Sequence, residues 1–246
     1  MGVQVESAIQ IEKADGIAVV RLAKPPVNTL DAEFLENLEQ EILAIRDVRG
    51  IVITGTGRAF SAGVDLQRLL DGGFPYAARL ISSMSSCFAT VYSLRVPVVA
   101  AVNGHAIAGG CALALACDTR YMSTGKFGLN ELALGLEFPP SILEIVTTVL
   151  GDRTYSVLTE AKLHDPEEAF NLRMVDRIVA PEELETKAIA EAARLASIPA
   201  PVFAAIKNKL RPSLKNSPSD AKVASDMAKQ WLIPENVERI KSIINR

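Results

Sequence analysis

The feature that most constrains the fold is an alternation of strand and helix patterns through the first two thirds of the chain. Residues 51–54 form a short β-branched run closed by Gly50 and Gly55, and a second apolar run spans residues 96–102. Between them, residues from about 76 to 94 have the apolar spacing of a helix. Parallel strands need long crossover connections, which are usually helical. The alternation therefore predicts an α/β fold with mostly parallel strand pairing.

The N-terminal residues predict a hairpin followed by a helix. Apolar residues alternate from Ile9 to Leu22 around Asp15-Gly16, a dipeptide that favours a two-residue hairpin turn. Asp31 is then placed to cap a helix, because its side chain can accept a hydrogen bond from the first turn. Helical spacing predicts that this helix buries Phe34, Leu35, Leu38, Ile42 and Ile45.

The pattern changes after residue 181. Residues 182–198, 201–210 and 219–244 have helical spacing, with prolines between them and no convincing strand. The sequence therefore predicts an α/β core over residues 1–181 and a helical region over residues 182–246.

Composition restricts the class of protein. Of 246 residues, 49% are hydrophobic and 22% charged, and the net charge is −3. This is typical of a globular protein and provides no basic field to attract nucleic acid or anionic lipid. We expect no membrane association, because no apolar stretch approaches the roughly 20 residues of a membrane span. Cys87, Cys111 and Cys117 form no C-x-x-C pair, which favours buried thiols, a reducing compartment and a cytoplasmic location.

Three glycine-containing stretches could carry chemistry: residues 57–66, 103–118 and 127–135. In the second, Gly109 and Gly110 open an apolar helix, whose first N–H groups lack internal partners and lie at its positive end. Such a helix start can stabilise an oxyanion, although a glycine pair before a helix is more often a tight turn. No G-x-G-x-x-G or G-x-x-x-x-G-K motif is present, so no dinucleotide or nucleoside triphosphate site is expected.

In this order, residues 60–66 (FSAGVDL), 103–118 (NGHAIAGGCALALACD) and 127–135 (FGLNELALG) resemble the crotonase, or enoyl-coenzyme A hydratase/isomerase, family. The resemblance covers nearly the whole chain. It implies a superhelical core of ββα units, with a C-terminal helical region that assembles a homotrimer or a dimer of trimers. It also implies an acyl-coenzyme A substrate of fatty acid metabolism, with no metal and no cofactor other than the coenzyme A of the substrate.

The resemblance assigns two backbone donors to the enolate of the thioester. They are the N–H groups of Val64 and Gly109, which we expect to point into one cavity, each about 3 Å from the thioester oxygen. Because both donors are main-chain groups, a valine can serve at the first position. The residues expected to bind the substrate near them are Ala62, Gly63, Asp65, Leu66 and Asn130.

The carboxylates separate the activities of this family. Its hydratases carry one glutamate two residues after the glycine pair and another in the third stretch; here these places hold Ala112 and Glu131. Water addition usually takes two acid/base groups, whereas one base can move a proton from C2 to C4 of a 3-enoyl thioester. Residues 129–131, which include Asn130, also resemble the Δ3,Δ2-enoyl-coenzyme A isomerases. The leading hypothesis is therefore an isomerase with Glu131 as its acid/base, in an apolar pocket beside Leu132 and Leu134 that raises its pKa.

Other interpretations remain open. Glu131 could be a solvated loop residue, and Glu137 or Glu144 could supply the second acid of a hydratase. His105 and His164 have no recognisable partner and are expected to be packed or exposed. Lys24 and Arg58 could reach coenzyme A phosphates, but isolated basic residues are more often simply solvated.

A non-catalytic acyl-coenzyme A-binding relative is a further alternative. An RNA-binding relative is disfavoured, because the first helix carries Glu33, Glu36, Glu39 and Glu41 rather than lysines. The C-terminal helices are expected to bury apolar side chains partly against another protomer or another part of the trimer. The side chains are Leu195, Phe203, Ile206, Met227 and Trp231.

Overall fold

The computed structural model describes residues 7–211, 214 and 221–245. Its main sheet has six strands in the order β1-β2-β3-β5-β7-β9. β1 and β2 pair antiparallel across the turn at Asp15-Gly16, and every other neighbouring pair in this sheet is parallel. The predicted hairpin and the predicted α/β class are therefore confirmed. The strands are β1 (Ile9–Ala14), β2 (Ile17–Leu22), β3 (Gly50–Gly55), β5 (Val98–Val102), β7 (Thr119–Met122) and β9 (Arg177–Ile178).

The central strands are buried on both faces, and the two-residue period of a strand divides their side chains between two cores. Ile51 and Ile53 of β3 join the larger core, whereas Val52 between them joins the smaller one. In the smaller core, Ala188 and Ala192 of α7 (Leu184–Ala196) pack against the sheet. This two-sided burial explains why β3 and β5 appear in the sequence as continuous apolar runs.

Helices α1 (Ala32–Ala44) and α2 (Leu66–Ser93) cover the opposite face of the sheet. Asp31 caps α1 as predicted, its carboxylate accepting a hydrogen bond from the N–H of Phe34 at 2.8 Å. α2 begins ten residues before the predicted start at residue 76. A kink explains the difference: Gly73 has a φ of 59° and Pro75 follows it, so the first turns have a different direction from the predicted segment.

A second, three-stranded parallel sheet places the catalytic candidates. Its strands are β4 (Ala59–Ser61), β6 (His105–Ile107) and β8 (Phe127–Gly128), in that order. Each strand belongs to one of the three glycine-containing stretches, so the sheet brings these distant stretches side by side. The apolar helix α3 (Gly109–Ala116) directly follows β6 and is buried along its whole length.

The chain then continues as a 3-10 turn, η1 (Glu131–Leu134), and helix α4 (Pro140–Leu150). Further short elements precede the C-terminal helices α8, α9 and α10. The remaining bounds are η2 (Gly151–Arg153), α5 (Thr154–Glu160), α6 (Pro166–Asn171), η3 (Pro181–Glu183), α8 (Ala200–Leu210), α9 (Ala221–Trp231) and α10 (Pro234–Ile244).

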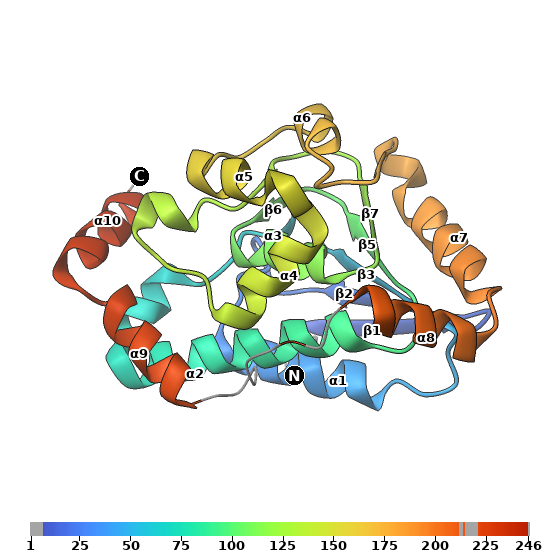
Figure 1. Cartoon of the computed structure of the whole chain (residues 1–246), viewed down its shortest axis with the longest axis horizontal. Coiled ribbons are helices and arrows are strands. Elements are labelled where there is room, and N and C mark those ends of the chain that lie inside the picture. The colour runs from blue at the N-terminus through green and yellow to red at the C-terminus, as the bar shows by residue number, and fades with distance from the viewer. Residues whose placement is uncertain (1–6, 212–213, 215–220, 246) are drawn as a thin grey trace, which may run out of the picture.

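The C-terminal helices divide between the two ends of the molecule. In Figure 1, α7 and α8 lie at the right end, whereas α9 and α10 lie at the left end beside the start of α2. The helical pattern predicted over 219–244 forms two helices, because Pro234 cannot continue the first and opens the second; residues 219 and 220 lie outside the described part of the chain. The boundary at residue 181 stays a prediction.

No single helix in the described ranges is long and apolar enough to cross a bilayer. The segments Pro181–Ala196 and Ala200–Leu210 have that length and apolar composition only when taken together, and they are bent by 100° relative to each other.

Two of the five C-terminal side chains expected at a protomer contact are buried within the chain itself. Met227 and Trp231 are 8% and 3% exposed, in the main core. Leu195 packs partly against the smaller core, and Phe203 is half-buried. Ile206 is 50% exposed and continues an apolar face of α8 with Val202 and Leu210.

Candidate active site

A cavity of about 320 Å³ lies where the three glycine-containing stretches meet. The first stretch contributes Val64, the second Gly109, and the third Glu131. The rest of the lining is mainly apolar and comes from β6, α2, α3, η1, α4, the C-terminal helices and the segments that connect these elements. It comprises Ala62, Leu66, Met84, Ile107, Ala108, Ala112, Asn130, Leu134, Leu136, Glu137, Phe138, Pro139, Ile142, Leu163, Trp231 and Ile243.

The first predicted donor, Val64, lies in a stretch held by backbone hydrogen bonds to Leu30. The N–H of Leu30 donates to Gly63 O at 2.8 Å, and the N–H of Asp65 donates to Leu30 O at 3.1 Å. In such a parallel bridge the N–H between the two bonded residues is left over. Among the described residues, no hydrogen bond from the Val64 N–H forms, so this amide is free for a ligand.

The second predicted donor, Gly109, is the first residue of α3. Its N–H has no acceptor within the described part of the chain, as expected for the first turn of a helix. A Cβ added at Gly63 would lie 3.4 Å from Gly109 N, and one added at Gly109 would lie 3.8 Å from Val64 Cγ2. The two donors are therefore neighbours. That their N–H bonds converge on one oxygen stays a prediction.

Gly110 has a different role from Gly109. A Cβ at Gly110 would overlap the carbonyl oxygen of Ser61, so only glycine lets α3 approach β4 this closely. At Gly109, the nearest atom to an added Cβ is the Leu30 Cδ1 at 3.2 Å, the end of a flexible side chain. The glycine pair thus combines a strict packing requirement at Gly110 with a less restricted, cavity-lining position at Gly109.

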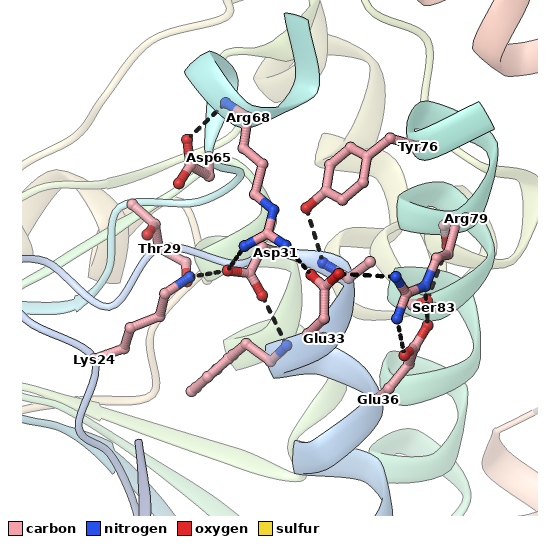
Figure 2. A network of polar contacts seen from close by, with 12 residues as sticks. Lys24, Thr29, Asp31, Glu33, Glu36, Asp65, Arg68, Tyr76, Arg79 and Ser83 are labelled. Carbon is pink, nitrogen blue, oxygen red and sulfur yellow. Dashed lines mark hydrogen bonds and ion pairs between the residues drawn. The ribbon is translucent and has the colours of Figure 1, made fainter. Parts of the chain in front are cut away.

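A polar network fixes the segment that carries the first donor (Figure 2). Arg68 of α2 contacts Asp31 at 3.3 Å and Glu33 at 2.8 Å, while Lys24 pairs with the same Asp31 carboxylate. Burial alone would raise the pKa of Asp31, but hydrogen bonds from Lys24 and from the Phe34 N–H hold it below its ordinary value. Because Asp31 adjoins Leu30, the network anchors the residue that binds Gly63 and Asp65.

The same network continues beyond the kink of α2. Arg79 binds Glu33 at 2.8 Å and Glu36 at 2.6 Å, and the Ser83 hydroxyl donates to Glu36 at 2.8 Å. Glu39 likewise accepts hydrogen bonds from α2 hydroxyls. Three of the four glutamates of α1, Glu33, Glu36 and Glu39, therefore pair with side chains of α2.

Glu131 is the first residue of η1, and it lines the cavity. Its Oε2 is buried and has no hydrogen-bond partner among the described residues. Burial raises the pKa of Glu131 to about 8, although nearby backbone N–H groups of Asn130 and Glu131 offset part of this rise. The alternative of a solvated loop carboxylate is therefore wrong.

The other carboxylates occupy different environments. Ala112 lines the cavity with a methyl group at the place where a second glutamate was considered. Glu137 also lines the cavity but is solvent-exposed. Glu144, on α4, is not part of the lining. Within the described residues, Glu131 and Glu137 are therefore the two carboxylates that reach this space.

The remaining predicted binding residues divide into two groups. Ala62, Leu66 and Asn130 line the cavity, and Asn130 also precedes η1 as its cap residue. Gly63 and Asp65 do not line it: Gly63 forms the turn with a φ of 85°, and Asp65 caps α2 by accepting from the Arg68 N–H at 3.0 Å. Gly63 and Asp65 therefore fix the backbone on either side of Val64 and do not themselves form the cavity wall.

Leu132 was expected beside Glu131, and this is wrong, because Leu132 is 40% exposed and does not line the cavity; Leu134 does. The reason is the tight 3-10 turn, which places residues three apart on one side. His164 is buried without lining the cavity, and His105 accepts from the Lys126 N–H. Among the described residues, no group of three or more His, Cys, Asp or Glu side chains is arranged to hold a metal ion.

Sequence reasoning missed part of the site. Trp231 and Ile243, from α9 and α10, line the cavity of their own chain. Helical spacing predicted burial for Trp231 but gave no sign of the surface that it covers, and no prediction was made for Ile243. Lys24, considered for phosphate contacts, is instead engaged by Asp31 and by Thr29 O at 3.1 Å.

Comparisons with known proteins show which family the chain is similar to. The family profile described as enoyl-CoA hydratase/isomerase matches residues 12–243. The chain is 30% identical over 203 residues to the mitochondrial enoyl-CoA delta isomerase 1 of Rattus norvegicus, covering 78% of this chain and 69% of that protein. It is 37% identical over 193 residues to a putative enoyl-CoA hydratase of Thermus thermophilus, covering 74% and 76%.

The crystal structure of human mitochondrial delta3-delta2-enoyl-CoA isomerase superimposes with a TM-score of 0.90 at 25% identity, covering 98% of each chain. The predicted crotonase-like fold is confirmed by this match. Isomerases and hydratases both occur among the relatives, so similarity alone does not select the reaction. The chain belongs to the enoyl-CoA hydratase/isomerase family.

Proposed function

We propose that this protein is an enoyl-CoA isomerase that moves a 3-enoyl double bond to the 2-position with Glu131 as its acid/base. The observation that carries the proposal is the pairing of an enclosed Glu131 carboxylate with the methyl group of Ala112 in one cavity. One enclosed base suffices for moving a proton along the acyl chain, whereas hydration needs a second positioned group and a bound water.

In the proposed reaction, the ionised Glu131 carboxylate removes a proton from C2 of the 3-enoyl thioester. The electrons of the C2–H bond form a dienolate whose charge rests on the thioester oxygen. The N–H groups of Val64 and Gly109 would stabilise that oxygen, and the dipole of α3 adds to the effect. Glu131 then returns the proton to C4, so the C3=C4 bond is lost and a C2=C3 bond is formed.

The environment of Glu131 supports both halves of this transfer. A carboxyl whose pKa is about 8 is a stronger base than an ordinary glutamate, and it holds a proton readily between the two steps. The mainly apolar lining favours an acyl chain over water beside the dienolate, which water would otherwise protonate.

The decisive experiment supplies matched 3-enoyl-CoA and 2-enoyl-CoA thioesters to the purified protein and identifies the products. The proposal expects conversion of the first to the 2-enoyl isomer and little water addition to the second. Rapid formation of a 3-hydroxyacyl thioester from the 2-enoyl substrate by the unmodified protein would overturn it.

A hydratase is the second candidate, and one observation favours it. Glu137 lines the same cavity as Glu131, so a water held between them could be activated. The two candidates differ in the effect of Glu137→Gln: a hydratase would lose water addition, whereas the proposed isomerase keeps its activity. A non-catalytic acyl-CoA-binding relative would bind thioesters and convert neither.

The proposal includes assembly as a homotrimer or a dimer of trimers through the exposed apolar face of α8, formed by Val202, Ile206 and Leu210. A face of this kind favours a protein contact over solvent. A cytoplasmic location remains part of the proposal as well; the names of the mammalian relatives specify the mitochondrion for those proteins.

A further inference from the structure

The junction of α9 and α10 binds the backbone that follows Glu131. The side-chain amides of Gln230 and Asn236 both donate to the carbonyl oxygen of Gly135, at 2.8 and 2.9 Å. The indole Nε1–H of Trp231 donates to Glu137 O at 2.9 Å. Three side chains separated from this loop by about a hundred residues thus satisfy two of its carbonyl groups.

The fit at Gly135 is close. Gly135 ends η1 with a φ of 75°, a conformation that favours glycine. A Cβ at this position would overlap the Asn236 Oδ1. Asn236 itself is 2% exposed, and its amide also donates to Gln230 O at 3.0 Å, so its orientation is fixed. Glycine at position 135 and the fixed amide of Asn236 are therefore both needed for this close contact between the loop and the helix junction.

Main-chain hydrogen bonds connect Gly135, which Gln230 and Asn236 bind, to Glu131. The N–H of Leu136, which lies between the two bound carbonyls, donates to Glu131 O at 3.1 Å. The Gly135 N–H donates to Leu132 O at 3.0 Å. Because the Oε2 of Glu131 has no hydrogen-bond partner among the described residues, its position depends on this backbone.

We propose that Asn236 and Gln230 are positioning residues that hold the Glu131 carboxylate in its buried place through the backbone of Gly135 and Leu136. The inference rests on the proposed function for its catalytic consequence, but its structural content is separate. Neither residue lines the cavity, so neither is expected to touch the substrate. The C-terminal helices thereby act on the reaction from within the same chain.

The first test measures kcat and KM for a 3-enoyl-CoA thioester in Asn236→Ala and in the milder Gln230→Leu. Losing a hydrogen bond to Gly135 O should let η1 shift and admit water to Glu131. We expect kcat to fall at least tenfold in Asn236→Ala and severalfold in Gln230→Leu, with KM changed less than threefold. The matched control is Asn171→Ala, an exposed asparagine at the end of α6, which should leave both constants unchanged.

The second test needs no enzymatic activity. It measures how much Glu131→Gln changes thermal stability between pH 5.5 and pH 8.5, first in the parent chain and then in the Asn236→Ala and Gln230→Leu backgrounds. In the parent, the difference grows with pH because the buried carboxylate resists ionisation. If Asn236 and Gln230 keep Glu131 buried, the increase with pH in the stabilising effect of Glu131→Gln should be less than half as large in both backgrounds as in the parent. A merely structural role would lower stability equally at each pH and leave the growth intact.

The outcomes separate the two proposals. A parent protein that fails to isomerise 3-enoyl-CoA overturns the proposed function, while the stability test still decides whether the junction positions Glu131. Conversely, the parent could be active while Asn236→Ala and Gln230→Leu keep full kcat. If the effect of Glu131→Gln on thermal stability also grows with pH in these variants as it does in the parent, the positioning role alone is overturned. Should Asn236→Ala fail to fold, the result in Gln230→Leu decides in either direction.

Discussion

Replacing Glu131 by glutamine should stabilise the protein, and increasingly so as the pH rises. The pKa of Glu131 is raised by burial from 4.5 to about 8. Between these values the unfolded chain releases the proton and the folded chain keeps it, so the unfolded state binds fewer protons and the stability of the parent falls with increasing pH. Glutamine keeps the shape of the side chain and has no proton to lose.

The magnitude follows from the shift. A pKa difference of about 3.5 corresponds to about 5 kcal/mol once the group is fully ionised in both states. Between pH 5.5 and 8.5 the advantage of Glu131→Gln should therefore grow by about 3 kcal/mol. For a chain of 246 residues this is on the order of 6–12 °C in the difference between the two melting temperatures.

The assay is thermal unfolding of both proteins at pH 5.5, 7.0 and 8.5, with protein concentration held constant because assembly would also affect stability. Glu137→Gln is the matched control, since Glu137 lines the same cavity but is solvent-exposed. Its effect on stability should change little over this range. An advantage of Glu131→Gln that stayed constant from pH 5.5 to 8.5 would refute the claim that burial raises this pKa.

The remaining predictions concern activity, packing and assembly. Glu131→Gln should abolish isomerisation while an acyl-CoA ligand still binds in calorimetry. In the parent, kcat/KM should rise with pH to a plateau with a midpoint near 8, because the ionised carboxylate is the base. Activity that is independent of pH from 6 to 9 would contradict this. Gly110→Ala should destabilise the fold by several times more than Gly109→Ala in denaturant unfolding, because its Cβ meets Ser61 O, whereas Gly109→Ala should chiefly reduce activity; equal losses of stability would contradict the packing argument. Ile206→Glu on the exposed face of α8 should convert the assembly to monomers in light scattering, and a parent that is already monomeric would show that this face is not an interface.

Local sequence signals were sufficient for much of the core. The hairpin turn at Asp15-Gly16 and the cap at Asp31 each depend on neighbouring residues, and both are present in the structure. The start of α2 was missed because Gly73 and Pro75 interrupt its helical pattern. Tertiary packing maintains the helix across a break that propensity alone treats as an end.

For the candidate site, the sequence alone set out the three stretches and the glycine pair, because each consists of residues close together in the chain. The resemblance of these stretches to the crotonase family then singled out Glu131. Only the tertiary structure decided that the Oε2 of Glu131 is buried and that Leu132 lies outside the cavity. It also decided that Trp231 completes the cavity of its own chain. Helical periodicity reports which face of a helix is apolar, but it carries no information about the surface which that face covers. Burial and pKa depend on such contacts between distant residues, and therefore they emerge only once the chain is folded.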